Sequence, residues 1–219
     1  MEAAADQPGS ADGLTDRLLH RPCARLPVCL LVHLPVTPNA VTLAGLALGM
    51  IAASQFWYAT PHSATLGLLW YFLQAVADHA DGELARQTGQ VSAFGHWLDV
   101  SVDTVTDMLI VVGMVVTAIS GNSPSTLVLG ALAGSGILLC SLFTNWFPPP
   151  ARRGVVRVTL RLANRDPVYI ILIGFLLLLW KADRLLPLFI WILIIGSHGY
   201  WLVHLSQRIA ASRSRQRDE

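Results

Sequence analysis

Charged side chains are scarce in this sequence. They make up 13% of its 219 residues, whereas hydrophobic residues make up 53%. The mean hydropathy is +0.53, which is too apolar, with too little charge, for an ordinary soluble domain. The composition therefore excludes most cytosolic enzyme classes and predicts an integral membrane protein.

Cysteine is also rare, and the three present are Cys23, Cys29 and Cys140. Their odd number and irregular spacing exclude a disulfide framework and a cysteine-rich metal site. Residues 1–13 have no basic start and no apolar run, so they do not resemble a secretory signal. We expect them to form a disordered tail.

Six apolar stretches approach the length of about 20 residues that a helix needs to cross a bilayer. They are Ala40–Tyr58, Ala64–Ala80, Phe94–Ser120, Ser125–Phe147, Val168–Ala182 and Leu185–Leu205. We predict an all-α fold with six transmembrane helices in a single membrane domain at 14–207, followed by a basic tail at 208–219.

A mixed segment, Leu14–Pro35, precedes the first stretch and alternates arginines with leucines. Its prolines at positions 22, 27 and 35 argue against a buried span. The segment is therefore predicted to be a broken amphipathic helix lying at the membrane interface.

The arginines fix the predicted orientation. With the N-terminus cytoplasmic, the outer loops carry only Lys181 and Arg184 of the 15 basic residues. Because inner loops are enriched in basic residues, we place both termini, and the turn between the second and third stretches, in the cytoplasm.

Five aspartates lie where the second stretch ends and the third begins. Acids at this depth cost several kcal/mol each unless they are paired or bind metal. Asp78 and Asp81 share one face of the second helix, and Asp99, Asp103 and Asp107 recur every four residues on the third. A short turn makes these helices antiparallel neighbours, so the acidic faces can meet around Mg²⁺ or Mn²⁺, which oxygen ligands favour.

The same residues form a longer pattern, D-x-x-D-G-x-x-A-R, eight residues, then G-x-x-x-D-x-x-x-D, which runs over Asp78–Arg86 and Gly95–Asp103. This pattern resembles the signature of the CDP-alcohol phosphotransferase family at every fixed position. A weaker resemblance lies in Thr37–Thr42, where many members carry a similar Pro-Asn-x-x-Thr run.

The resemblance implies six transmembrane helices around a polar cavity open to the cytoplasm, usually in a homodimer. It implies two Mg²⁺ or Mn²⁺ ions held by Asp78, Asp81, Asp99 and Asp103. Asp103 would also be the base that deprotonates the acceptor hydroxyl. The residues implied for CDP binding are Asn39, Thr42, Asp78, Gly82, Ala85 and Arg86. For Asp107 we favour a hydrogen bond to a metal ligand over a place as a further ligand.

The expected function is the transfer of a substituted phosphate group from CDP-diacylglycerol to a small polyol or polyol phosphate, with release of CMP, in phospholipid biosynthesis. An alternative is a soluble CDP-alcohol donor, as in di-inositol phosphate or aminoalcohol phosphotransferases. A cation transporter that uses intramembrane acids is the alternative outside enzymes. Membrane lipids are expected partners and nucleic acids are not.

A cluster of arginines precedes the fifth stretch. Arg157, Arg161 and Arg165 recur every four residues and so share one helical face. They are able to bind the phosphate of an acceptor, but a cytoplasmic loop that holds anionic lipid headgroups has the same composition. The sequence favours neither interpretation.

Overall fold

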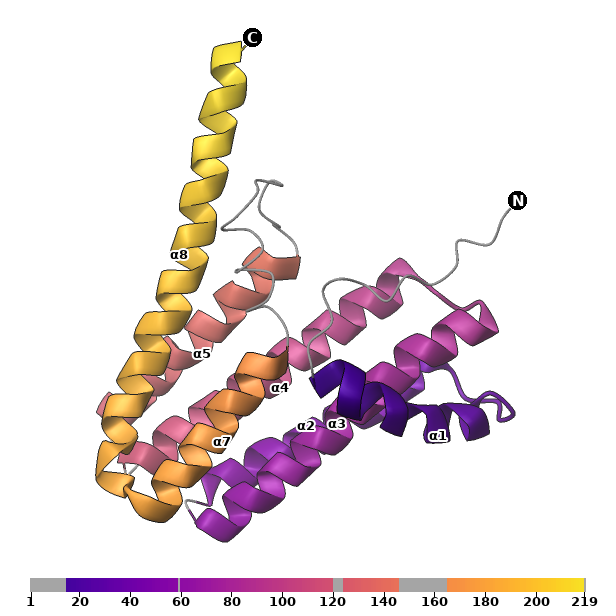
Figure 1. The fold of residues 1–219 in the computed structure, drawn as a ribbon, viewed down its shortest axis with the longest axis horizontal. Coiled ribbons are helices and arrows are strands. Elements are labelled where there is room, and N and C mark those ends of the chain that lie inside the picture. The colour runs from indigo at the N-terminus through magenta and orange to yellow at the C-terminus, as the bar shows by residue number, and fades with distance from the viewer. Residues whose placement is uncertain (1–14, 59, 120–123, 146–164, 219) are drawn as a thin grey trace.

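The computed structural model describes residues 15–58, 60–119, 124–145 and 165–218, and every regular element in these ranges is a helix (Figure 1). The first element of the described residues is the π-helical turn η1 (Asp16–His20), which continues into α1 (Arg21–Leu31). Longer helices follow, and the last is preceded by the 3-10 turn η2 (Asp183–Leu185). They are α2 (Pro38–Trp57), α3 (Pro61–Thr88), α4 (Ala93–Ile119), α5 (Pro124–Asn145), α7 (Arg165–Lys181) and α8 (Leu186–Asp218).

Each predicted apolar stretch coincides with one of these longer helices. Four helical regions are long and apolar enough to cross a membrane: Pro38–Trp57, Ala93–Ile119, Pro124–Asn145 and Asp183–Ala210. α3 has a polar second half that lowers its hydropathy, and the apolar part of α7, Val168–Lys181, is shorter. For the described residues, the prediction of an all-helical fold with membrane-spanning segments is thus confirmed, with four helical regions that qualify as spans where six were predicted.

The N-terminal segment differs from the expected broken helix. Pro22 lies where η1 passes directly into α1, and the helix continues through Pro27. On its inner side Ala24 and Val28 are buried in a small cluster that also holds Leu84 of α3. Packing against α3 therefore stabilises α1 as a helix through Pro27.

α2 lies at the centre of the N-terminal half and packs closely against both α3 and α4. α4 then packs on α5, α5 packs on α8, and α7 packs on α3 and α8. Buried aromatic and aliphatic side chains from all six longer helices form the main core, among them Phe56, Tyr71, Met114, Phe175 and Ile190. The core fixes the α3, α4, α7 and α8 surfaces that surround the cavity described below.

The connection between α3 and α4 is short, as predicted. α3 ends at Gly89, whose φ of +68° closes the helix in the left-handed conformation that glycine favours. α3 and α4 are nevertheless not packed as close neighbours, because α2 lies against both and α4 packs on its other side against α5. Their acidic segments meet through side chains, which leaves space between the two helices.

The close approach of α2 and α4 depends on Gly49. A Cβ built there would contact Oγ1 of the buried Thr106 and lie 2.7 Å from its Cγ2 and 3.1 Å from its Cβ. At Gly45, one turn earlier on α2, the nearest atom would be the Cβ of Ala77 at 3.7 Å. The first position has no room for a methyl group and the second has enough.

Gly49→Ala is therefore expected to lower the thermal unfolding temperature of the protein in detergent. Overpacking costs about 1–3 kcal/mol, which exceeds the gain of about 1 kcal/mol in helix propensity. Gly45→Ala is the matched control and should keep or raise that temperature. Equal unfolding temperatures for the two variants would contradict the packing described for α2 and α4.

Candidate active site

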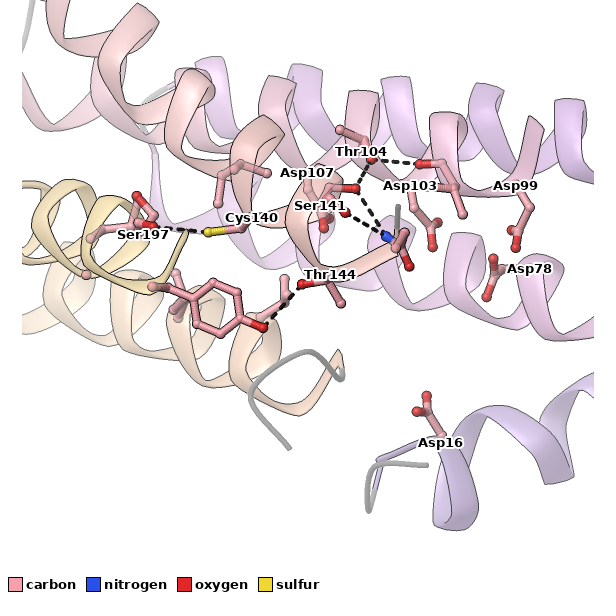
Figure 2. Close-up of a pocket in the computed structure, with 18 of the residues that line it drawn as sticks. Asp16, Asp78, Asp99, Asp103, Thr104, Asp107, Cys140, Ser141, Thr144 and Ser197 are labelled. Carbon is pink, nitrogen blue, oxygen red and sulfur yellow. Dashed lines mark hydrogen bonds between the residues drawn. The ribbon is translucent and has the colours of Figure 1, made fainter. Parts of the chain in front are cut away.

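Three carboxylates from two helices converge on one point. An oxygen each from Asp78 of α3 and Asp99 and Asp103 of α4 lie within 4.8 Å of one another, and the side chains face a shared space (Figure 2). Oxygens on opposite sides of a Mg²⁺ ion lie about 4.2 Å apart. Small side-chain rotations would thus let the three acids bind one divalent ion, and hard oxygen ligands suit Mg²⁺ or Mn²⁺.

The carboxylates line a cavity of about 740 Å³ formed by α3, α4, α5, α7, α8 and the N-terminal segment. Asp16 points toward the same space from η1 (Figure 2). Away from the acids the lining includes polar side chains of α4, α5 and α8 and apolar side chains of α7 and α8. The polar group comprises Thr104, Ser141, Thr144, Asn145, Ser197 and Tyr200, and the apolar group Val168, Ile171, Phe189, Ile192 and Leu193.

Buried donors on α3 hold two acids of α4. The Gln74 amide donates to Asp103 Oδ1 at 2.8 Å, and the Tyr71 hydroxyl donates to Asp107 Oδ1 at 3.0 Å. Both donors are 1% exposed. Sequence analysis missed them, although they precede Asp78 by four and seven residues and so share its helical face. Asp107 lines the cavity and is not part of the three-carboxylate cluster.

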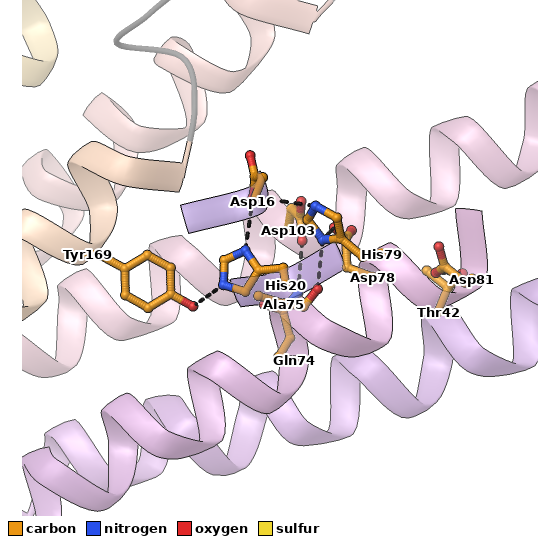
Figure 3. A network of polar contacts seen from close by, with 10 residues as sticks. All are labelled: Asp16, His20, Thr42, Gln74, Ala75, Asp78, His79, Asp81, Asp103 and Tyr169. Atoms are coloured by element: carbon orange, nitrogen blue, oxygen red, sulfur yellow. Dashed lines mark hydrogen bonds and ion pairs between the residues drawn. The ribbon is translucent and has the colours of Figure 1, made fainter. Parts of the chain in front are cut away.

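Asp81 lies apart from the three converging acids. Its buried carboxylate accepts a hydrogen bond of 2.5 Å from the Thr42 hydroxyl of α2. Thr42, Gln74, Asp78 and Asp81 border one narrow interior gap that has no room for a water molecule. Figure 3 shows Asp81 beside Thr42, about one turn along α3 from Asp78. The structure thus brings three of the four predicted metal ligands together and places the fourth next to them.

Of the residues predicted to bind CDP, Thr42 and Asp78 border this gap. The others lie on the adjoining parts of α2 and α3. Oδ1 of Asn39 would lie 3.3 Å from a Cβ added at Gly95, so the start of α2 lies close to the start of α4. Gly82 is half-buried, and a Cβ there would meet only Arg86 within 4 Å. Arg86 donates to Glu83 at 2.8 Å and is largely exposed. Ala85 is half-buried on the same helix.

The predicted arginine cluster is only partly within the structure. Arg157 and Arg161 lie outside the described residues, and Arg165 begins α7.

Thr104, which follows Asp103, forms a hydrogen bond of 2.5 Å with Ser141 of α5 and so joins α4 to α5 at the cavity wall.

A model of the CDP-alcohol phosphatidyltransferase family matches residues 35–201, which include Asp78, Asp81, Asp99, Asp103 and Asp107. The chain belongs to this family. The resemblance predicted from the spacing of the aspartates is thereby confirmed.

Curated relatives differ in how much of their length is matched. The chain is 36% identical to an archaetidylinositol phosphate synthase of Pyrococcus horikoshii over 84 residues, which are 38% of this chain and 43% of the relative. It is 27% identical to cholinephosphotransferase 1 of Gallus gallus over 132 residues, 57% of this chain and 39% of that protein. The chain thus covers less than half the length of these two relatives.

A phosphatidylinositol phosphate synthase of Mycobacteroides abscessus is 29% identical over 181 residues. This match covers 81% of the chain and 78% of the relative, so it extends over most of both proteins.

The hydrogen bond between Thr42 and Asp81 yields a stability prediction. Thr42→Val keeps the shape of the side chain but leaves a buried carboxylate without this donor, at a cost of about 1.5–3 kcal/mol. Thr42→Ser keeps the hydroxyl and is the matched control. We expect the Val variant, and not the Ser variant, to unfold at a clearly lower temperature in detergent without divalent ions. Identical unfolding temperatures for the two would show that this bond contributes nothing.

Proposed function

We propose that this protein transfers a substituted phosphate group from a CDP-linked donor to the hydroxyl of a small polyol or polyol phosphate and releases CMP. The observation that carries the proposal is the convergence of Asp78, Asp99 and Asp103 at one end of a cavity of about 740 Å³. A cavity of this size suits a nucleotide-sized ligand. Family membership makes this chemistry the first to test.

In this proposal Asp78, Asp99 and Asp103 hold one divalent ion, and Asp81, about one turn from Asp78 on α3, completes a site for two. When bound, Mg²⁺ or Mn²⁺ neutralises the charge that develops as the pyrophosphate bond breaks. Asp99 and Asp103 are one helical turn apart on α4 and face Asp78 across the gap to α3. The protein thus supplies fixed carboxylates from two helices whose separation is set by α2.

Asp103 is proposed to take the proton from the acceptor hydroxyl. The hydroxyl oxygen then attacks the donor phosphorus that carries the transferred group, the bond from that phosphorus to the CMP oxygen breaks, and CMP leaves with those electrons. Gln74 donates to Oδ1 of Asp103, which fixes the rotamer of the carboxylate. Asn39 and Thr42 at the start of α2, with Gly82, Ala85 and Arg86 on α3, are proposed to surround the CDP group.

We further propose that all six longer helices cross the membrane, with both termini and the cavity on the cytoplasmic side. At 1.5 Å per residue, α3 and α7 are about 42 and 26 Å long. Asp78 and His79 of α3 face the cavity, and Gln74 and Asp81 are buried against other helices, so these four polar residues do not oppose a place for α3 in the membrane. α1 exposes Leu26 and Leu30, side chains suited to the membrane interface. A homodimer remains part of the proposal.

The relative matched over most of its length is named for the synthesis of phosphatidylinositol phosphate, so a polyol phosphate is the first acceptor to test and CDP-diacylglycerol the first donor. The match to cholinephosphotransferase keeps a soluble CDP-alcohol donor as the second candidate.

The direct test incubates purified protein in detergent with CDP-diacylglycerol or CDP-choline. Each donor is paired with inositol, inositol phosphate, glycerol 3-phosphate, serine or diacylglycerol. CMP release and product mass are measured with Mg²⁺, with Mn²⁺ and with EDTA. The proposal expects CMP release that requires a divalent ion and one preferred acceptor. Metal-independent release, or none with any pair, would reject it.

Asp103→Asn is expected to lower kcat by about 100-fold or more, because the amide keeps the size of the side chain but cannot accept the hydroxyl proton. CDP binding, measured separately by calorimetry, should change less. Asp183→Asn, at an exposed acid of η2, is the control and should match the wild type. Wild-type turnover in Asp103→Asn would remove this residue from the proposed role.

The arginine cluster gives a kinetic prediction. If Arg157, Arg161 and Arg165 bind an acceptor phosphate, single replacement by Ala should raise KM for the acceptor and leave KM for the CDP donor unchanged. Arginines that hold lipid headgroups contribute about 1 kcal/mol each and are screened by salt. Equally small effects on both constants in all three variants would favour the headgroup role and an uncharged acceptor.

A further inference from the structure

A second group of metal-ligating side chains lies beside the acidic cluster. Asp16 and His20 of η1 and His79 of α3 each offer one ligand atom, and these atoms lie within 4.8 Å of one another. His20 is fully buried and Asp16 is 8% exposed. Asp16 and His79 also line the cavity, so the group stands at its wall.

The two histidines direct their inner nitrogens at the same oxygen. Nδ1 of His20 is 2.9 Å and Nε2 of His79 is 3.4 Å from Oδ1 of Asp16 (Figure 3). Ligand atoms bound to a tetrahedral ion at about 2.0 Å are about 3.3 Å apart. Both histidine nitrogens therefore already lie at about this separation from the Asp16 oxygen, and all three ligand atoms lie within 4.8 Å of one another.

The outer nitrogens of both rings have polar partners. Nδ1 of His79 is 2.9 Å from the carbonyl oxygen of Ala75 and 3.4 Å from Oδ2 of Asp78. Because a carbonyl can only accept, this nitrogen carries the hydrogen, and in the neutral ring Nε2 presents a lone pair to Asp16. Nε2 of His20 is 2.8 Å from the hydroxyl of Tyr169 on α7. Without an ion, Nδ1 of His20 donates to Asp16; binding of an ion at Nδ1 would move the hydrogen to Nε2, from which the Tyr169 hydroxyl can accept. Metal-bound histidines have this arrangement, in which the outer N–H is held by an oxygen.

We propose that Asp16, His20 and His79 form a binding site for a divalent transition-metal ion, of the zinc class, that is separate from the Mg²⁺ or Mn²⁺ site. Two imidazoles and one carboxylate suit Zn²⁺, Co²⁺ or Fe²⁺ rather than Mg²⁺, which prefers oxygen. Three protein ligands leave at least one position open. In the neutral ring, the lone pair on Nε2 of His79 faces the carboxylate of Asp16. The ion would bind both of these atoms.

The bound ion would join three parts of the fold that are distant in sequence. Asp16 and His20 come from η1, His79 from α3, and the Tyr169 partner from α7. The ring of Tyr169 also packs on Tyr71 at 5.4 Å between centroids, and Tyr71 donates to Asp107. The ion would therefore fasten the N-terminal segment to the wall of the cavity.

Metal binding is measured without substrate, so the result is independent of the proposed transferase activity. Tag-free protein with Cys23 and Cys29 both changed to Ser is titrated with Co²⁺ in a large excess of Mg²⁺, which occupies the acidic cluster. Cys23 and Cys29 are exposed, and their removal prevents binding through surface thiols. Visible absorption reports nitrogen coordination, and calorimetry with Zn²⁺ gives the affinity.

One equivalent of Co²⁺ is expected to bind the parent protein, and His20→Gln is expected to abolish that binding. Tyr169→Phe removes a single oxygen atom and should weaken binding about 10- to 100-fold through loss of the outer partner. The control is His33→Gln, at an exposed histidine of the N-terminal segment that is not in the group, and its affinity should equal that of the parent. Zn²⁺ should also raise the unfolding temperature of the parent and not that of His20→Gln.

Absence of Co²⁺ and Zn²⁺ binding in the parent protein would overturn the proposal and reduce the group to a hydrogen-bonded contact between η1 and α3. Equal affinity in the parent and His20→Gln would also overturn it. If His20→Gln does not fold, Tyr169→Phe decides the outcome, because unchanged affinity in that variant contradicts the described ligand arrangement.

Discussion

The rest of this structure depends on the cost of placing carboxylates among apolar helices. Asp78, Asp81, Asp99 and Asp103 lie in a chain with few charges, where acids without partners are expensive. The fold meets this constraint by turning the acids toward one another and toward a cavity, away from the apolar outer faces. The same gathering that limits the desolvation cost produces a site suited to divalent cations.

α2 sets the distance between the two helices that carry these acids. It lies against both α3 and α4 and allows them to meet only through their polar side chains. Gly49 lets α4 approach α2 closely, while Thr42 bonds to Asp81 across the α2–α3 contact. The distance between the two acidic helices is thus a property of a third helix that carries no acid.

Neutral donors complete the arrangement. Tyr71, Gln74 and Thr42 each donate to one aspartate from another helix, which fixes carboxylate rotamers without placing a positive charge beside them. This leaves the negative potential of the cluster available for metal ions. The N-terminal segment contributes Asp16 to the same cavity, and its histidine contacts extend the polar network to α7.

The sequence by itself determined the positions of the longer helices, the acidic motif and the family, because hydropathy and the three- and four-residue spacing of acids are local properties of the chain. It also indicated which faces of α3 and α4 carry acids. It missed the continuity of α1 through Pro27, and it predicted that α3 and α4 are direct neighbours. The packing of α2 against both helices, the separate place of Asp81 and the meeting of His20 with His79 and Tyr169 depend on contacts between distant segments. Only the tertiary structure decided them, because such contacts follow from side-chain packing and have no periodic signal in the sequence.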